Sequence, residues 1–158
     1  MIKNIVAMSC LEAVQYVFYN RIGGDKFAII SIQEFETDGN GFLFTETGCC
    51  KKVLTLNFSD VDPGIFAKYN ETEHLQKLIS ENKCKVFDKK DAKKIKDFMK
   101  EIQKDEEIKT LIVHCSAGVS RSPAVAAAIH NKLFGNPSHF FETQVPNKYI
   151  YSLLLENL

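Results

Sequence analysis

Cys115 and Arg121 are the two residues whose types and spacing are best suited to chemistry. An ionised cysteine is a strong nucleophile, and the planar guanidinium of arginine binds two oxygens of a phosphoryl group at once. The chain has 20 basic residues, of which only Arg21 and Arg121 are arginines. An arginine at this position departs from the lysine used elsewhere, so the pair indicates nucleophilic attack on a bound phosphoryl group.

The segment that joins this pair has small side chains that leave the backbone N–H groups accessible. In a tight turn such groups point inward, and the N-terminus of a following helix adds about half a positive charge. Gly118 supplies a position that accepts a positive φ. The segment therefore predicts a site for phosphate, sulfate or vanadate, and the same field favours the ionised form of Cys115. The expected phosphate-binding residues are Ser116, Ala117, Gly118, Val119, Ser120 and Arg121.

Such a site needs a strand that ends at the cysteine and a helix that begins near the arginine. The apolar run at residues 110–114 predicts the strand. Ser122-Pro123 opens a predicted helix that continues to Leu133 and is ended by Gly135. Strand, cysteine, loop, arginine and helix thus follow one another in the order that a phosphate pocket requires.

The rest of the chain supplies a layered frame. Apolar runs predict further strands over residues 2–8, 27–32 and 52–58. Helices are predicted over residues 11–22, from Asp88 to Ile102, and over 146–158, and the turn residues at 38–41 predict a solvated loop or hairpin. This alternation predicts the α/β class, with a central, mostly parallel sheet flanked by helices.

With His114 before the cysteine and Ser122 after the arginine, the segment reads His-Cys-five residues-Arg-Ser. It resembles the cysteine-dependent protein tyrosine phosphatases, most closely their small dual-specificity-like and bacterial tyrosine-phosphatase-like members, over residues 51–134. The resemblance implies a phosphatase-type loop in which Cys115 attacks phosphorus and forms a phosphocysteine. It also implies that Arg121 and the loop amides hold the equatorial oxygens, that Ser122 stabilises the departing thiolate and that His114 supports the cysteine.

The leaving group needs a proton, so a carboxylic acid must lie across the pocket. Asp88 and Asp91 fit the cap and first turn of their predicted helix and need no catalytic role. Asp60 and Asp62 follow a strand directly, in a turn-rich segment. Similar bacterial phosphatases have an aromatic-x-Asp pattern at this place, which Phe58-Ser59-Asp60 matches. Asp60 is therefore the expected acid, and Asp62 is the alternative.

The resemblance implies hydrolysis of phosphate monoesters, foremost phosphotyrosine and also phosphoserine or phosphothreonine in proteins. The expected partner is a phosphoprotein or phosphopeptide. Phosphoinositide phosphatases, which resemble the segment less, place basic residues inside the loop. No cation lies between Cys115 and Arg121 here, which favours a protein substrate. A phosphoinositide phosphatase, or a phosphopeptide-binding module with little or no turnover, stays as an alternative.

Length and composition narrow the class of protein. The 158 residues, 45% of them apolar and 25% charged, predict one globular domain over residues 1–158. Acidic and basic residues balance at 20 each, so no overall field draws nucleic acid or an anionic membrane surface. The longest apolar run, residues 124–129, is too short to span a bilayer. A cytoplasmic protein without nucleic-acid or membrane partners is expected.

The remaining cysteines and histidines predict no metal site or cofactor. Five cysteines make an odd number, and their spacing fits neither a disulfide framework nor a metal motif, so reduced thiols are expected. The adjacent Cys49 and Cys50 motivate one hypothesis, a reversible disulfide with Cys115 that shields it from over-oxidation. Three histidines show no ligand spacing, namely His74, His130 and His139.

Overall fold

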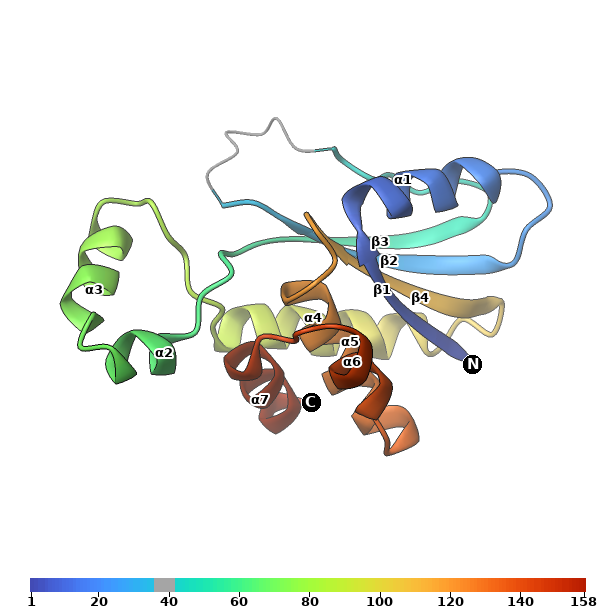
Figure 1. Cartoon of the computed structure of the whole chain (residues 1–158). Coiled ribbons are helices and arrows are strands. Elements are labelled where there is room, and N and C mark those ends of the chain that lie inside the picture. The colour runs from blue at the N-terminus through green and yellow to red at the C-terminus, as the bar shows by residue number, and fades with distance from the viewer. Residues whose placement is uncertain (36–41) are drawn as a thin grey trace.

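The computed structural model describes residues 1–35 and 42–158, which contain four strands and seven helices (Figure 1). The strands are β1 (Asn4–Ser9), β2 (Lys26–Gln33), β3 (Cys50–Asn57) and β4 (Ile108–Cys115). The helices are α1 (Cys10–Tyr19), α2 (Pro63–Lys68), α3 (Thr72–Ser80), α4 (Lys89–Ile102), α5 (Arg121–Phe134), α6 (Ser138–Thr143) and α7 (Lys148–Asn157). The turn predicted at residues 38–41 lies outside the described residues. None of the described helices has the length and apolar character needed to cross a bilayer.

The four strands form one parallel sheet in the order β1-β4-β2-β3. Side chains alternate between its faces, as the pleat requires. In β2, Ala28, Ile30 and Ile32 join the larger core, whereas Phe27 and Ile29 join a smaller one on the other face. Both faces are buried, which is why the strands have continuous apolar sequences. The predicted α/β class and its parallel sheet are confirmed.

Helices cover the two faces unequally. Figure 1 shows α1 on one face and α4, α5 and α7 on the other. The larger core packs between the sheet and these three helices. The start of α4 is fixed by the predicted cap, because the Asp88 carboxylate accepts hydrogen bonds from the N–H groups of Lys90 and Asp91 at 2.9 and 3.0 Å. That prediction is confirmed.

Helix α5 begins at Arg121, one residue before its predicted start. Pro123 consequently lies in the first turn rather than at the first helical position, and a first turn tolerates proline because its N–H groups have no intrahelical partner. Gly135 ends the helix with φ +81°, as expected. The shift matters for the site, because it places Arg121 and Ser122 at the rigid beginning of the helix.

The segment after β3 holds two helices that the sequence patterns did not predict, α2 and α3, and α6 was missed as well. Figure 1 shows α2 and α3 projecting as an arm beyond the sheet. The arm has a small core of its own, made by Val61, Leu75 and Cys84. These helices have only 6 to 9 residues, too few for the periodicity of a long amphipathic helix to appear. The arm begins immediately after Asp60 and Asp62.

Candidate active site

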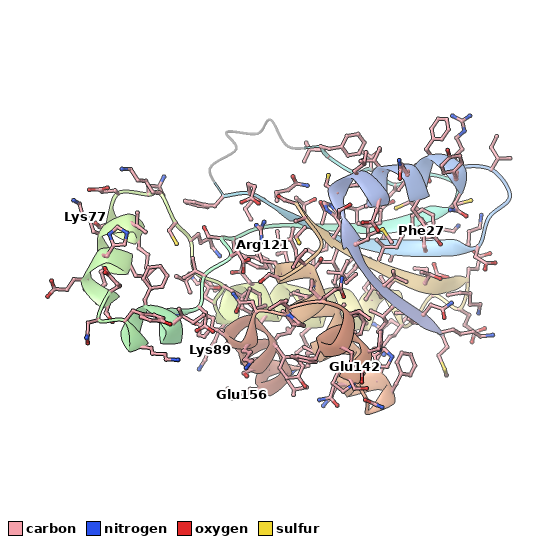
Figure 2. The ribbon with its side chains drawn as sticks, viewed as in Figure 1. Phe27, Lys77, Lys89, Arg121, Glu142 and Glu156 are labelled. Atoms are coloured by element: carbon pink, nitrogen blue, oxygen red, sulfur yellow. The ribbon has the colours of Figure 1, made fainter. Side chains whose placement is uncertain are left out.

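The loop between β4 and α5 lies at the carboxyl ends of the strands, near the middle of the molecule, where Figure 2 labels Arg121. Its backbone is pressed against β1. Gly118 has φ +73°, and a Cβ atom there would lie 2.4 Å from the backbone N of Ser9 and 2.5 Å from the carbonyl carbon of Met8. Only glycine fits such a position. The side chains of Ser116, Ala117 and Val119 are exposed at the mouth of the loop.

The sulfur of Cys115 lies at the foot of this loop, where the residue is only 3% exposed. The N–H of Gly118 donates to Sγ at 3.2 Å, and the Ser122 hydroxyl lies 3.2 Å from Sγ. That hydroxyl has one hydrogen and also lies 3.4 Å from the Met8 carbonyl oxygen. A thiolate at this position can only accept, so it would compete with the Met8 carbonyl for the Ser122 hydrogen. Both contacts stabilise negative charge on the sulfur.

His114 holds the loop from behind. Its Nδ1 lies 3.2 Å from the Cys115 carbonyl oxygen, and its Nε2 lies 2.6 Å from the Ser31 hydroxyl. A carbonyl only accepts, so Nδ1 carries the hydrogen and Ser31 donates to Nε2; the Gln33 amide in turn donates to Ser31 at 2.6 Å. Burial lowers the pKa of His114, and the charge of Arg121 lowers it further, although the bond to the Cys115 carbonyl opposes this. The lowered pKa favours the neutral ring.

Arg121 is buried, and its guanidinium is held on two sides. Nη1 donates to the Phe58 carbonyl oxygen at 3.0 Å, and Nη2 donates to the Glu34 carboxylate. The Ser116 hydroxyl donates to the same carboxylate at 2.5 Å. Burial opposes ionisation of Glu34, but these two hydrogen bonds and the guanidinium charge together lower its pKa. Glu34 thus fixes both the arginine and the first residue of the loop, a role that no local sequence pattern indicated.

Asp60 is exposed and contacts the last residue of the loop before Arg121. Its Oδ1 accepts from the Ser120 hydroxyl at 2.8 Å and from Nδ2 of Asn147 at 3.0 Å. Asp62, the alternative acid, instead caps α2 by accepting from the N–H of Gly64 at 2.9 Å. The contacts of Asp60 join the segment after β3 to the loop between β4 and α5, whereas Asp62 caps a helix. The arrangement favours Asp60.

Asn147 is a second residue that sequence analysis missed. It is 8% exposed and lies at the N-cap of α7, where its Oδ1 accepts from the N–H of Ile150 at 3.1 Å. Its Nδ2 also donates to the Val61 carbonyl at 3.1 Å, and its backbone N–H donates to the Ser120 carbonyl at 3.1 Å. Asn147 therefore connects α7, the segment after β3 and the loop before Arg121.

Cys49 and Cys50 are not brought to Cys115. In the sheet register, Cys50 and Thr110 both pair with Phe27. Five residues of strand, about 16 Å at the usual rise, separate the level of Thr110 from Cys115. A disulfide needs Cα atoms within about 7 Å, so the hypothesis of a bridge from this pair is wrong. All five cysteines are free thiols.

The described residues hold no group of three or more His, Cys, Asp or Glu side chains arranged to bind a metal ion. The contacts of Cys115, Arg121 and Asp60 nevertheless define the chemistry available to the site. It has a buried sulfur that receives hydrogen bonds, a fixed guanidinium, accessible loop residues and one exposed carboxylate. Such a set can bind a tetrahedral oxyanion, attack it and protonate a leaving group.

Comparison with known proteins gives a match in structure but none to a family model or a curated protein. No protein-family model matches the chain, and no curated protein matches it. Among solved structures, it is similar to a human tyrosine phosphatase-like serine/threonine/tyrosine-interacting protein. The identity is 18% over 92% of this chain and 82% of that chain, with a TM-score of 0.47. The chemistry of the site is therefore inferred from the positions of its own side chains and backbone groups.

Proposed function

We propose that this protein is a phosphatase that hydrolyses phosphate monoesters of proteins through a phosphocysteine intermediate. The observation that carries the proposal is the environment of Cys115 Sγ. It receives the Gly118 N–H and the Ser122 hydroxyl, each at 3.2 Å, at the foot of a loop that leads into α5. A sulfur stabilised as an anion inside a phosphate cradle is the nucleophile that this reaction needs.

In the first step the Cys115 thiolate attacks phosphorus, an S–P bond forms and the ester P–O bond breaks. Arg121 and the loop amides hold the equatorial oxygens of the transferred group. The departing oxygen takes a proton from the carboxylic acid of Asp60, so the alcohol or phenol leaves neutral. The hydrogen bonds from Ser120 and Asn147 support the orientation of this carboxyl group.

In the second step water attacks phosphorus and the S–P bond breaks. The Asp60 carboxylate, now ionised, takes the proton from the water, and the sulfur leaves as a thiolate. The Ser122 hydroxyl and the Gly118 N–H stabilise that charge as it returns to the sulfur. Phosphate is released, and the two steps restore the starting protonation of both Cys115 and Asp60.

The proposed substrate is foremost phosphotyrosine in a protein, with phosphoserine and phosphothreonine as further candidates. Support comes from the loop interior, in which residues 116–120 include no cation that would bind the additional phosphates of an inositol lipid. The three side chains at the mouth, Ser116, Ala117 and Val119, are uncharged. Glu34, whose pKa is lowered, adds negative charge there and disfavours a polyanionic substrate.

Hydrolysis of p-nitrophenyl phosphate tests this proposal. We expect vanadate-sensitive turnover by the wild-type protein and none by Cys115→Ser. Phenyl phosphate has a poor leaving group, phenolate, which needs a proton as it departs. Asp60→Asn should lower turnover of this ester by about 10²- to 10⁴-fold, the range of general acid catalysis. A wild-type protein that binds phosphopeptides but leaves p-nitrophenyl phosphate intact would be a binding module. An unaltered rate in Asp60→Asn would reassign the acid to Asp62.

A further inference from the structure

A cavity of about 420 Å³ opens beside the candidate active site, on the side of Asp60. Three separate parts of the chain form it. Asp60 and Ile65 come from the segment after β3 and from α2, Ser120 comes from the phosphate loop, and Val145 and Lys148 come from the region leading into α7. Asp60 and Ser120 thus belong both to the cavity and to the candidate active site.

The cavity presents apolar side chains to solvent. Val145 is 72% exposed and Ile65 is 55% exposed. The Val145 backbone is fixed to the phosphate loop, because its N–H donates to the Val119 carbonyl at 3.0 Å, and Val119 is itself 49% exposed. An apolar group that entered the cavity would remove the surfaces of Val145 and Ile65 from water, which is favourable in proportion to the apolar area covered.

The charges of the cavity point to the same kind of occupant. Its carboxylates, Asp60 and Asp62, already accept hydrogen bonds from Ser120, Asn147 and Gly64. They would repel an acidic side chain. Among the described residues that line this cavity, Lys148 is the only basic one, and it is exposed to solvent. The exposed apolar side chains, Val145 and Ile65, therefore supply the preference for an apolar side chain of the substrate.

We propose that this cavity binds an apolar side chain next to the phosphorylated residue of a polypeptide substrate. The inference rests on the proposed function and deepens it, because it distinguishes proteins from small phosphoesters. A neighbouring residue lies within about 3.8 Å of the phosphorylated one along the chain, from Cα to Cα. Since the cavity shares Asp60 and Ser120 with the candidate active site, a residue at that spacing reaches it, whereas a small phosphoester leaves it empty.

Paired phosphopeptides test the inference. Each pair has leucine or serine immediately before the phosphorylated residue, or immediately after it, in phosphotyrosine and phosphothreonine versions. For one of the two positions we expect kcat/KM to be about tenfold higher with leucine, the low end of the discrimination expected for an apolar group in a pocket. Val145→Ser and Ile65→Ser should each lower this leucine-to-serine ratio toward one.

The matched control is Ile22→Ser. Ile22 is 83% exposed and precedes β2, at the opposite end of the sheet from Cys115, so the ratio should keep its wild-type value. A wild-type ratio near one at both positions would overturn the inference. So would a ratio that Val145→Ser and Ile65→Ser leave unaltered, or one that Ile22→Ser lowers equally.

Binding separates this inference from the proposed function. Fluorescence anisotropy of the same labelled peptides on Cys115→Ser measures the leucine preference without turnover. If wild-type protein fails to hydrolyse p-nitrophenyl phosphate while Cys115→Ser binds the leucine peptides more tightly, the proposed function fails and the cavity inference stands. If hydrolysis occurs without any leucine preference in rate or binding, the cavity inference fails alone. Failure of Cys115→Ser to bind any of the peptides overturns the inference.

Discussion

Replacing Gly118 with alanine tests whether the close approach of the loop to β1 creates the site. Two costs can be worked out from the structure. A residue with a Cβ atom at φ +73° pays about 1–2 kcal/mol for the left-handed conformation. The new methyl group would also lie 2.4 Å from Ser9 N and 2.5 Å from Met8 C, which are backbone atoms that no side-chain rotation can move away. Overpacking of this kind costs about 1–3 kcal/mol more.

Gly118→Ala should therefore lower the free energy of unfolding by about 2–5 kcal/mol in total. Relief of the clash moves the loop away from β1, which displaces the Gly118 N–H that donates to Cys115 Sγ at 3.2 Å. Loss of this donor, together with the altered loop, should abolish vanadate binding and turnover. Stability is measured by urea unfolding, and vanadate binding by titration calorimetry.

Gly135→Ala is the matched control. Gly135 also has a positive φ, +81°, but a Cβ atom there would meet nothing within 4 Å. It should pay only the conformational cost of about 1–2 kcal/mol and retain full vanadate affinity. Equal losses of stability in the two variants, or unaltered vanadate binding by Gly118→Ala, would refute the reasoning.

Two further predictions concern residues that the sequence patterns did not reveal. Asn147→Ala removes a hydrogen bond to Asp60. It should slow hydrolysis of phenyl phosphate about tenfold more than hydrolysis of p-nitrophenyl phosphate, which is part of the full general-acid effect. Equal slowing of the two reactions would leave Asn147 only a structural role. Glu34 has a lowered pKa in the folded protein, so its pairing with Arg121 contributes stability above the ordinary pKa of glutamate and loses it as the pH falls through the lowered value. Urea unfolding should therefore show Glu34→Gln less stable than wild type at pH 7, by up to about 1 kcal/mol because the pair is partly exposed. The difference should vanish once the pH falls below the lowered pKa of Glu34. A difference independent of pH would contradict this.

The loop between β4 and α5 could be predicted from sequence because its determinants are contiguous. The apolar strand before Cys115, the small residues after it and the glycine that ends α5 all lie within one stretch of chain. Asp60 was selected from its position after a strand and from the aromatic-x-Asp pattern that the resemblance supplies. The roles of Cys115 and Asp60 in catalysis stay predictions. The strands and the long helices followed from apolar periodicity, which a buried parallel sheet and amphipathic helices impose.

Glu34 and Asn147 could not be predicted, because their partners are remote in sequence. Each lies 87 residues from the residue it holds, Arg121 in one case and Asp60 in the other. Sequence periodicity reports which face of an element is buried, but not which polar side chains meet at the end of a sheet. The helices α2 and α3 could not be predicted for a different reason, because the residues of their small core, Val61, Leu75 and Cys84, are far apart in the sequence and meet only when the arm folds.

The most direct test of the central claim is to trap the covalent intermediate. Wild-type protein mixed rapidly with a phosphotyrosine peptide and quenched in acid should yield one phosphorylated peptide, with the phosphoryl group on the sulfur of Cys115. Asp60→Asn should accumulate more of it than wild type with a substrate that has a good leaving group, because the second step needs Asp60 as a base. Turnover without a phosphorylated Cys115, or a phosphoryl group on any other residue, would contradict the account.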